Sequence, residues 1–204
     1  MRALWPGLLL LLLSCACSNH RYFVPRENTN GTGPGGYPAA VYRIDAGVLG
    51  GSVGEVRVWS EGAHFVDTEE DEVVELHLGF EIENTSTVPL ALDLVTLRCA
   101  DVAIGRTRLT LEPVRIEGVA DAAPGTTTRV DAFFRPGYEP WPQDIGGFSA
   151  HFRILAGGQP ALTQVTPFAP YSPRDYWYGD PWAWGPGYWG YGIGFGFSYG
   201  YHCH

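Results

Sequence analysis

The sequence contains no lysine, a single methionine and little charge of either sign. All 13 basic residues are arginines, against 22 acidic residues, so the formal net charge is −9. Nucleic-acid binding needs a basic footprint for the phosphates, so this balance excludes a nucleic-acid partner. The chain also has no amphipathic helical pattern of even three turns, and its 27 glycines and 16 prolines exclude a helical bundle.

No apolar run is long enough to cross a membrane. The longest is the six leucines of residues 8–13, whereas a transmembrane helix needs about 20 apolar residues. A short apolar run after a single charged residue, Arg2, and before small residues is typical of a secretion signal. Residues 1–14 are therefore predicted to be a signal peptide that is removed.

The junction after this run carries a short motif. Residues 12–15, Leu-Leu-Ser-Cys, resemble the lipobox of bacterial lipoproteins. The resemblance implies that the mature chain starts at Cys15, which carries lipid, palmitate included, and anchors the protein durably to a membrane. Ala16 follows where Asp would favour inner-membrane retention, so the resemblance also implies the outer membrane of the cell envelope. Two alternatives are ordinary secretory cleavage near Ala16 and lipidation of Cys17.

The mature chain divides into three stretches of different composition. Residues 15–38 are rich in Asn, Thr, Gly and Pro, and this predicts a flexible tether. Residues 39–170 show short alternating runs separated by turn residues, which predicts an all-β domain with antiparallel strands in a sandwich. Residues 171–204 form a tail rich in Gly, Tyr and Trp.

The clearest strand runs over residues 74–83. Its apolar positions alternate with polar ones, so one face is expected in the core and the other, with Glu75 and His77, in solvent. Further strands are expected at residues 55–59, 90–97, 106–111, 128–134 and 148–155, and weaker ones near Tyr42, Phe65, Val114 and Leu162.

Part of this domain resembles a known module. The segments LHLGFEIENTSTVPLALDLVTLRC, APGTTTRVDAFFRP and GFSAHFRIL, within about residues 73–155, are similar to the immunoglobulin-like modules of bacterial envelope lipoproteins. In those modules a strand ends in an Asn-Thr turn, and a Pro-Gly turn precedes a strand that ends in Phe. The resemblance implies an immunoglobulin-like β-sandwich, a module type that mostly binds or positions other molecules.

The tail is the most unusual segment. It holds 13 of the chain's 28 aromatic residues, and over residues 191–201 five aromatic residues and Ile193 alternate with Gly or Ser. As a strand it would have one aromatic face and one nearly bare face, which favours docking on a partner, docking on a membrane interface, or self-association. A last strand of the home domain and plain disorder are the alternatives. The candidate partner-binding residues are Trp189, Tyr191, Phe195, Phe197, Tyr199 and Tyr201.

The chain ends with His202, Cys203 and His204, whose side chains are ligand types for Zn or Cu. A fourth ligand is not visible, so a divalent metal stays an alternative, and no cofactor is expected. With Cys15 lipidated, three cysteines remain, and in an oxidising compartment a disulfide between Cys99 and Cys203 is the favoured pairing.

Nine acidic residues and no arginine lie between Glu61 and Glu83, which predicts an acidic face. The run over residues 67–72 lacks the spacing of a calcium loop and is expected to be a solvated hairpin tip. His77, His151 and His64 are expected at the surface. No nucleophile elbow, phosphate loop or metalloprotease motif is present, so an enzyme is not expected.

Together these features predict a lipid-anchored envelope protein with a binding or structural role. Its membrane contact is the lipid anchor, and its sandwich and tail engage a protein or envelope-surface partner or a second copy. The alternatives are a metal-binding or metal-delivery lipoprotein that uses residues 202–204, and a periplasmic sensor or solute-binding module.

Overall fold

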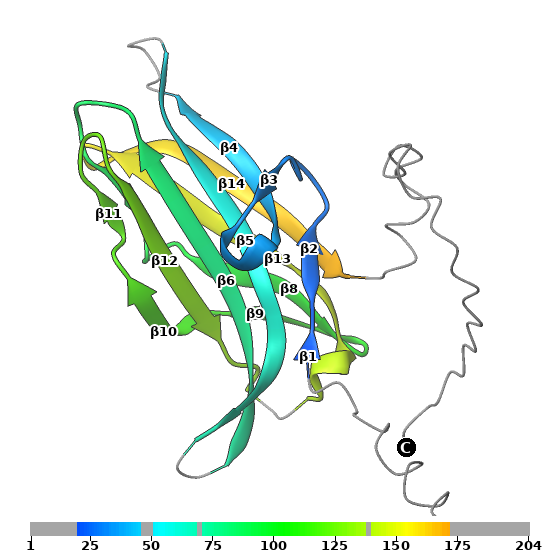
Figure 1. Cartoon of the computed structure of the whole chain (residues 1–204). Coiled ribbons are helices and arrows are strands. Elements are labelled where there is room, and N and C mark those ends of the chain that lie inside the picture. The colour runs from blue at the N-terminus through cyan, green and yellow to red at the C-terminus, as the bar shows by residue number, and fades with distance from the viewer. Residues whose placement is uncertain (1–19, 46–50, 69–70, 138–139, 172–204) are drawn as a thin grey trace, which may run out of the picture. The chain divides into compact units, whose positions relative to one another are not determined.

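The chain folds into two antiparallel β-sheets that pack face to face (Figure 1). The computed structural model describes residues 20–45, 51–68, 71–137 and 140–171. In these ranges the regular structure is strands and two short 3-10 helices, η1 (Pro34–Gly36) and η3 (Pro142–Asp144). The predicted all-β sandwich is confirmed.

The first sheet is built around two long strands, β5 and β6, which pair along most of their length. We call it sheet A, and β1 adds to the free edge of β5. In spatial order its members are β10 (Pro113–Gly118), β12 (Thr127–Phe134), β6 (Glu72–Asn84), β5 (Ser52–Asp67), β4 (Pro38–Asp45) and β3 (Gly31–Thr32), with β1 (His20–Arg21) beside β5.

The second sheet, sheet B, is built around β13, which pairs with three other strands. One arm continues through β14 to β2, and another through β8 to β9. Its members are β11 (Asp121–Ala122), β7 (Leu90–Leu92), β13 (Ile145–Ala156), β14 (Gln159–Pro170), β2 (Phe23–Pro25), β8 (Arg98–Ile104) and β9 (Thr107–Leu111).

A single hydrophobic core fills the space between the sheets. Alternation places the apolar phase of β6 inward, because successive side chains of a strand point to opposite faces. Aromatic rings join the layers: Phe152 of β13 meets Phe80 of β6 edge-on at 5.4 Å and Tyr42 of β4 at 6.0 Å. These contacts fix the two sheets against each other.

The turn after β6 shows why a polar residue ends this strand. Asn84 is buried, and its side-chain amide donates to the carbonyl oxygens of Val88 and Ala122, both at 2.8 Å. Its side-chain oxygen accepts from the backbone N–H of Ser86 at 2.9 Å. One side chain therefore satisfies the buried backbone groups of two connections.

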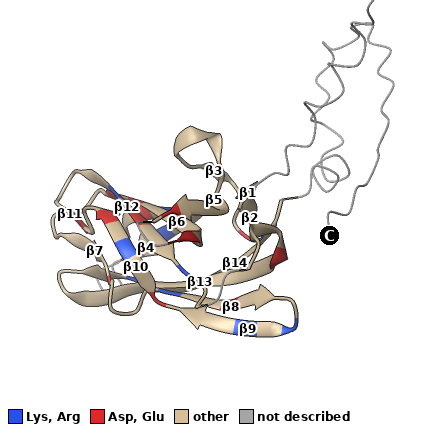
Figure 2. Cartoon of the chain, turned by 90° about the horizontal axis from the view of Figure 1, so that it is seen from below, with Lys and Arg blue, Asp and Glu red and all other residues tan. Residues whose placement is uncertain are grey.

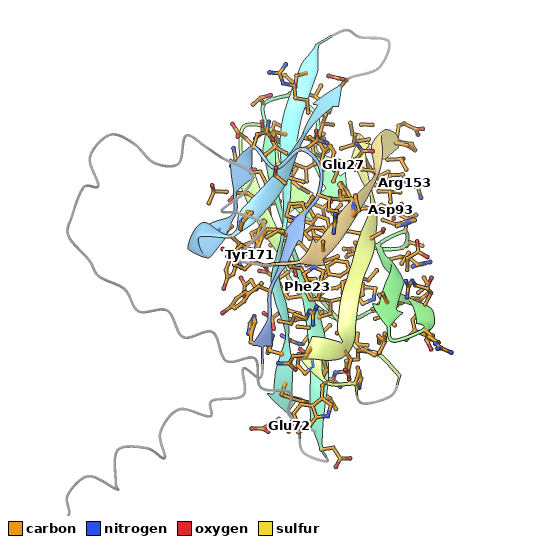
Figure 3. The ribbon with its side chains drawn as sticks, turned by 90° about the vertical axis from the view of Figure 1, so that its right-hand side faces the viewer. Phe23, Glu27, Glu72, Asp93, Arg153 and Tyr171 are labelled. Carbon is orange, nitrogen blue, oxygen red and sulfur yellow. The ribbon has the colours of Figure 1, made fainter. Side chains whose placement is uncertain are left out.

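The structure corrects the expected tether over residues 20–38. This stretch forms β1, β2, β3 and η1, and Phe23 is 1% exposed in the core between the sheets (Figure 3). Phe23 packs edge-on against Phe148 at 5.1 Å. The Asn, Gly and Pro residues of this stretch predicted a flexible segment, so the burial of Phe23 was not expected from the composition. At the C-terminal boundary of the domain, β14 ends at Pro170, which pairs with Phe23 of β2.

The expected strand over residues 90–97 is shorter than predicted. β7 ends at Leu92, and a turn follows in which Asp93 accepts from the backbone N–H of Val95 at 3.1 Å. The two Arg153 nitrogens Nε and Nη2 also donate to this carboxylate, at 2.9 and 2.7 Å (Figure 3). Burial alone would raise the pKa of Asp93, but bonds from Thr96, Arg153 and Val95 hold it below its usual value.

Candidate functional site

The outer face of sheet A carries the largest concentration of interacting charged side chains among the described residues. The sequence predicted that this face of β6 is wet. The structure places Glu75 and His77 on that face, but they are only 1% and 2% exposed. The phase of the strand was predicted correctly and the exposure of these two residues was wrong.

A bulge in β5 positions the first group of side chains. The register between β5 and β6 shifts between Trp59 and Gly62. Inside the bulge, the Ser60 hydroxyl donates to the carbonyl oxygen of His77 at 2.6 Å and accepts from the backbone N–H of Gly62 at 3.1 Å. Gly62 has φ 111°, in the region that favours glycine. The extra residue therefore re-aims Glu61 toward β12.

His77 is held by bonds to both ring nitrogens. The backbone N–H of Glu61 donates to Nδ1 at 3.0 Å, and Nε2 lies 2.9 Å from Oδ1 of Asp131 on β12. An amide N–H can only donate, so Nδ1 is the acceptor and the proton of the neutral ring is on Nε2. His77 is therefore oriented as a donor to Asp131.

Arg129 completes this network. Its Nε and Nη2 donate to Asp131 at 2.7 and 2.9 Å, and Nη2 also donates to Glu61 at 3.3 Å. Burial would raise the pKa of Asp131, but the hydrogen bonds from His77 and Arg129 lower it below its ordinary value of 3.8. The network is thus a pair of carboxylates bridged by one arginine, which balances one of their two negative charges.

The ligand atoms of Glu61, His77 and Asp131 lie within 4.8 Å of one another, close enough to consider a metal ion. The donor set does not fit one. A neutral histidine binds a metal through a nitrogen lone pair, but Nδ1 is engaged by an amide and Nε2 carries the proton. Arg129 already bonds to both carboxylates and balances one of their two negative charges.

The same group does not form a nucleophilic triad. Ser60 lies next to His77, but its hydroxyl donates to the backbone carbonyl of His77 and not to the ring. A nucleophile needs its base within hydrogen-bond reach, and both ring nitrogens of His77 have other partners. Chemically, this arrangement fixes the bulge and the β6–β12 pairing.

Glu75 forms a second network further along β6. Arg115 of β10 donates to one carboxylate oxygen at 2.7 Å, and Arg135 donates to the other through Nε and Nη2 at 3.0 and 2.7 Å. The Arg115 guanidinium also lies 3.5 Å from the centre of the Phe133 ring. Burial would raise the pKa of Glu75, but the two arginines lower it below its ordinary value of 4.5.

Trp59 shows how tightly this face is covered. It lies on the outer face of sheet A and is completely buried. A Cβ on Gly79 would overlap its indole, a Cβ on Gly33 would lie 2.7 Å from it, and Arg129 covers the ring at 5.2 Å. Gly33, in the glycine-rich segment before η1, therefore packs directly against the Trp59 ring and helps to cover it.

These contacts correct the predicted acidic face. The acidic residues that reach it from β5 and β6 meet arginines, because Arg57 of β5 pairs with Glu55 of the same strand and with Glu81 and Glu83 of β6. Figure 2 shows acidic and basic segments side by side on β12, β6 and β5. In the predicted hairpin over residues 67–72, β5 ends at Asp67 and β6 begins at Glu72, and these two residues pair with each other.

Aromatic side chains gather at the end of the domain where β1 lies. His20 stacks on Tyr22 at 4.1 Å and on His64 at 5.4 Å, and its Nε2 lies 2.6 Å from the carbonyl oxygen of Glu61. His64, expected at the surface, is half-buried, and burial followed by the nearby His20 lowers its pKa. The backbone N–H of Tyr171 donates to the carbonyl oxygen of Tyr22 at 2.8 Å.

Most of the site residues predicted from sequence fall elsewhere. Outside the described residues lie Cys15, Trp189, Tyr191, Phe195, Phe197, Tyr199, Tyr201, His202, Cys203 and His204. Cys99 is described, and it is a free cysteine buried in the core, where burial raises the pKa of its thiol. A disulfide with Cys203 stays a prediction, and it would require the tail to enter the core.

The chain matches no protein family, no curated protein and no solved structure to which it was compared. Among the described residues, no helix has the length and apolar character that a membrane span requires. Function must therefore be inferred from the residues themselves.

Proposed function

We propose that this chain is a bacterial envelope lipoprotein, anchored to the outer membrane through Cys15, whose sandwich supports an aromatic C-terminal segment that binds a protein or envelope-surface partner. The sandwich is a rigid module in this proposal, and the tail is the part that makes the contact. In this proposal the protein has a binding or structural role and catalyses no reaction.

One observation carries the proposal. β14 pairs with β2 from Phe168 to Pro170, and Tyr171 then bonds to Tyr22, two residues after β1 begins. The start of the tail and the connection to the anchor are therefore held at the same end of the domain. The tail therefore begins at the end of the domain that is connected to the proposed anchor.

The charged networks support a rigid module. Seven acidic and arginine side chains, from β5, β6, β10, β12 and the residue that follows β12, meet each other in the Glu61 and Glu75 networks, so their bonding capacity is used inside the domain. These are Glu61, Glu75, Arg115, Arg129, Asp131, Arg135 and Glu117. Such networks specify one arrangement of the strands more than they add affinity for a ligand.

The test is in-cell crosslinking followed by affinity capture from the detergent-solubilised envelope. It compares the full chain with a chain that ends at Tyr171, which keeps the bond to Tyr22. A partner, or a second copy, captured only by the full chain supports the proposal. Equal capture by both forms would place the contact on the sandwich and contradict the role of the tail.

The anchor is tested separately in the same cells. Radiolabelled palmitate is expected on the full chain and on the chain that ends at Tyr171, and it should be lost in Cys15→Ser. The matched control is Cys17→Ser, which should keep the label. Label retained by Cys15→Ser would contradict lipidation at this position.

A further inference from the structure

The exposed aromatic residues of the domain are concentrated around β1. Only three aromatic side chains in the described ranges are strongly exposed: Tyr22 at 44%, Trp141 at 60% and Tyr171 at 41%. The other strongly exposed large apolar residues in those ranges are valines and one isoleucine. We call the three aromatic residues the β1 patch.

Contacts connect the members of the patch to β1. Tyr171 bonds to the backbone of Tyr22, and Arg21 of β1 donates to the carbonyl oxygen of Gln143 in η3. Trp141 precedes η3, and its backbone N–H donates to the Asp144 carboxylate at 3.0 Å. The three aromatic residues therefore lie near one short strand, although they come from distant parts of the sequence.

We propose that the β1 patch lies on the lipid bilayer that holds the anchor and sets the orientation of the sandwich on it. This inference rests on the proposed lipidation of Cys15. Trp and Tyr have an apolar body and a polar tip, and they concentrate at the boundary between headgroups and acyl chains.

The short length of chain between Cys15 and β1 supports the lipid bilayer as the surface that the β1 patch contacts. Only five Cα steps separate Cys15 from His20, which span at most about 18 Å when fully extended. β5 alone runs over 16 residues, or about 50 Å. The segment between Cys15 and His20 is therefore much shorter than the domain. Because β1 is paired to β5, the end of the domain at β1 must stay close to the membrane.

Charge indicates the kind of contact. Arg21 of β1 lies next to Tyr22 of the patch, and the Asp144 carboxylate accepts from the backbone N–H of Trp141. The nearby hairpin between β5 and β6 carries Asp67 and Glu72 at its tip. The patch thus has no basic surplus for anionic lipid. We expect the contact to depend on aromatic burial, and therefore to form on zwitterionic lipid without any gain from anionic lipid.

The experiment uses the full acylated chain in phosphatidylcholine vesicles that contain a phosphatidylcholine with a diazirine at the top of one acyl chain. After irradiation, mass spectrometry identifies the labelled residues. We expect several-fold more label on Tyr22, Trp141 and Tyr171 than on Val95 and Val165, which are 80% and 49% exposed and serve as internal controls. Adding phosphatidylglycerol should not increase the label.

A pair of matched variants tests the cause. Tyr22→Ser with Trp141→Ser should lower the label on the neighbouring residues Arg21 and Gln143 to the level of the controls. Val95→Ser with Val165→Ser should leave it unchanged. Both variants replace exposed side chains, and both keep the anchor, so both should float with the vesicles.

The outcomes separate this inference from the proposed function. Flotation that depends on Cys15, with no label above the controls on the β1 patch, overturns this inference and leaves the anchor standing. Flotation unchanged in Cys15→Ser overturns the anchor itself. In native envelopes, crosslinks from the β1 patch to a protein in place of lipid would also overturn the inference.

Discussion

At the scale of single residues, the outer face of sheet A is unusual because a buried carboxylate depends on two half-exposed arginines. Glu75 is 1% exposed, whereas Arg115 and Arg135 reach solvent. Removal of the carboxylate leaves two arginines that can turn toward water. Removal of both arginines leaves a buried charge without partners, which is the costlier change.

We therefore predict that Arg115→Ala combined with Arg135→Ala destabilises the domain by about 3 kcal/mol. Glu75→Gln should cost about 1 kcal/mol, close to the net worth of a hydrogen bond. Urea denaturation at pH 7 measures both. Equal costs for the two variants would show that Glu75 is not held in a dry environment.

The same carboxylate makes stability depend on pH. Its pKa is lower in the folded protein than its ordinary value of 4.5, since Arg115 and Arg135 outweigh burial. Glu75 therefore contributes stability above about pH 4.5, and that stability is lost as pH falls through the folded pKa. Denaturation between pH 6 and pH 3 should show a smaller loss for Glu75→Gln than for the wild type. Parallel curves for the two proteins would contradict this.

Another prediction at this scale concerns the space below Trp59. Gly79→Ala is expected to destabilise the domain by about 1–3 kcal/mol, because the new Cβ overlaps the indole of a completely buried side chain. Gly137→Ala is the control, since no atom lies within 4 Å of its Cβ position. Thermal unfolding that is unchanged in Gly79→Ala would mean that Trp59 is mobile.

At the scale of elements, the N-terminal strands differ most from the sequence prediction. Phe23→Ala in β2 should cost about 3–5 kcal/mol, because Phe23 is 1% exposed and packs on Phe148. Tyr22→Ala is the neighbouring control and should change stability little, because Tyr22 is exposed. Denaturation curves that coincide for Phe23→Ala and the wild type would restore the tether prediction.

The sequence predicts the elements whose signal is local. The alternation of β6 and the turn at Asn84 are both readable, since neighbouring residues carry them. The burial of Glu75 and His77 is not, because it depends on Arg135 and Asp131, which are more than 50 residues away. β2 was missed because three residues are too few to show a period.

The bulge of β5 was also outside the reach of the sequence. Ser60, Glu61 and Gly62 break the alternation of the strand, but nothing in their types distinguishes a bulge from a turn. Only the partner strand shows that Glu61 donates its N–H to His77. The register between paired strands therefore brings the residues of the candidate site together. Local sequence patterns do not specify this register for strands that are distant in the sequence.

At the scale of the whole molecule, the sandwich and its attachments meet at one end. β14 and β2 form the last pairing of sheet B, and β1 lies two residues before β2. This arrangement brings together the start of β1, the β1 patch and Tyr171, where the tail begins. The C-terminal boundary of the folded domain can therefore be tested by comparing two truncated chains that differ by three residues.

A chain that ends at Tyr171 should unfold at the same temperature as the full chain, because every strand pairing of the described residues is kept. A chain that ends at Phe168 loses the pairs of Ala169 with Val24 and Pro170 with Phe23, and also the Tyr171 bond. We expect a fall of several degrees, at about 2–4 °C for each kcal/mol. Calorimetry of both chains, with the full chain as reference, measures this difference. A large fall already at Tyr171 would mean that the tail is a structural part of the sandwich, and the tail could then not be the free contact segment that the proposed function requires.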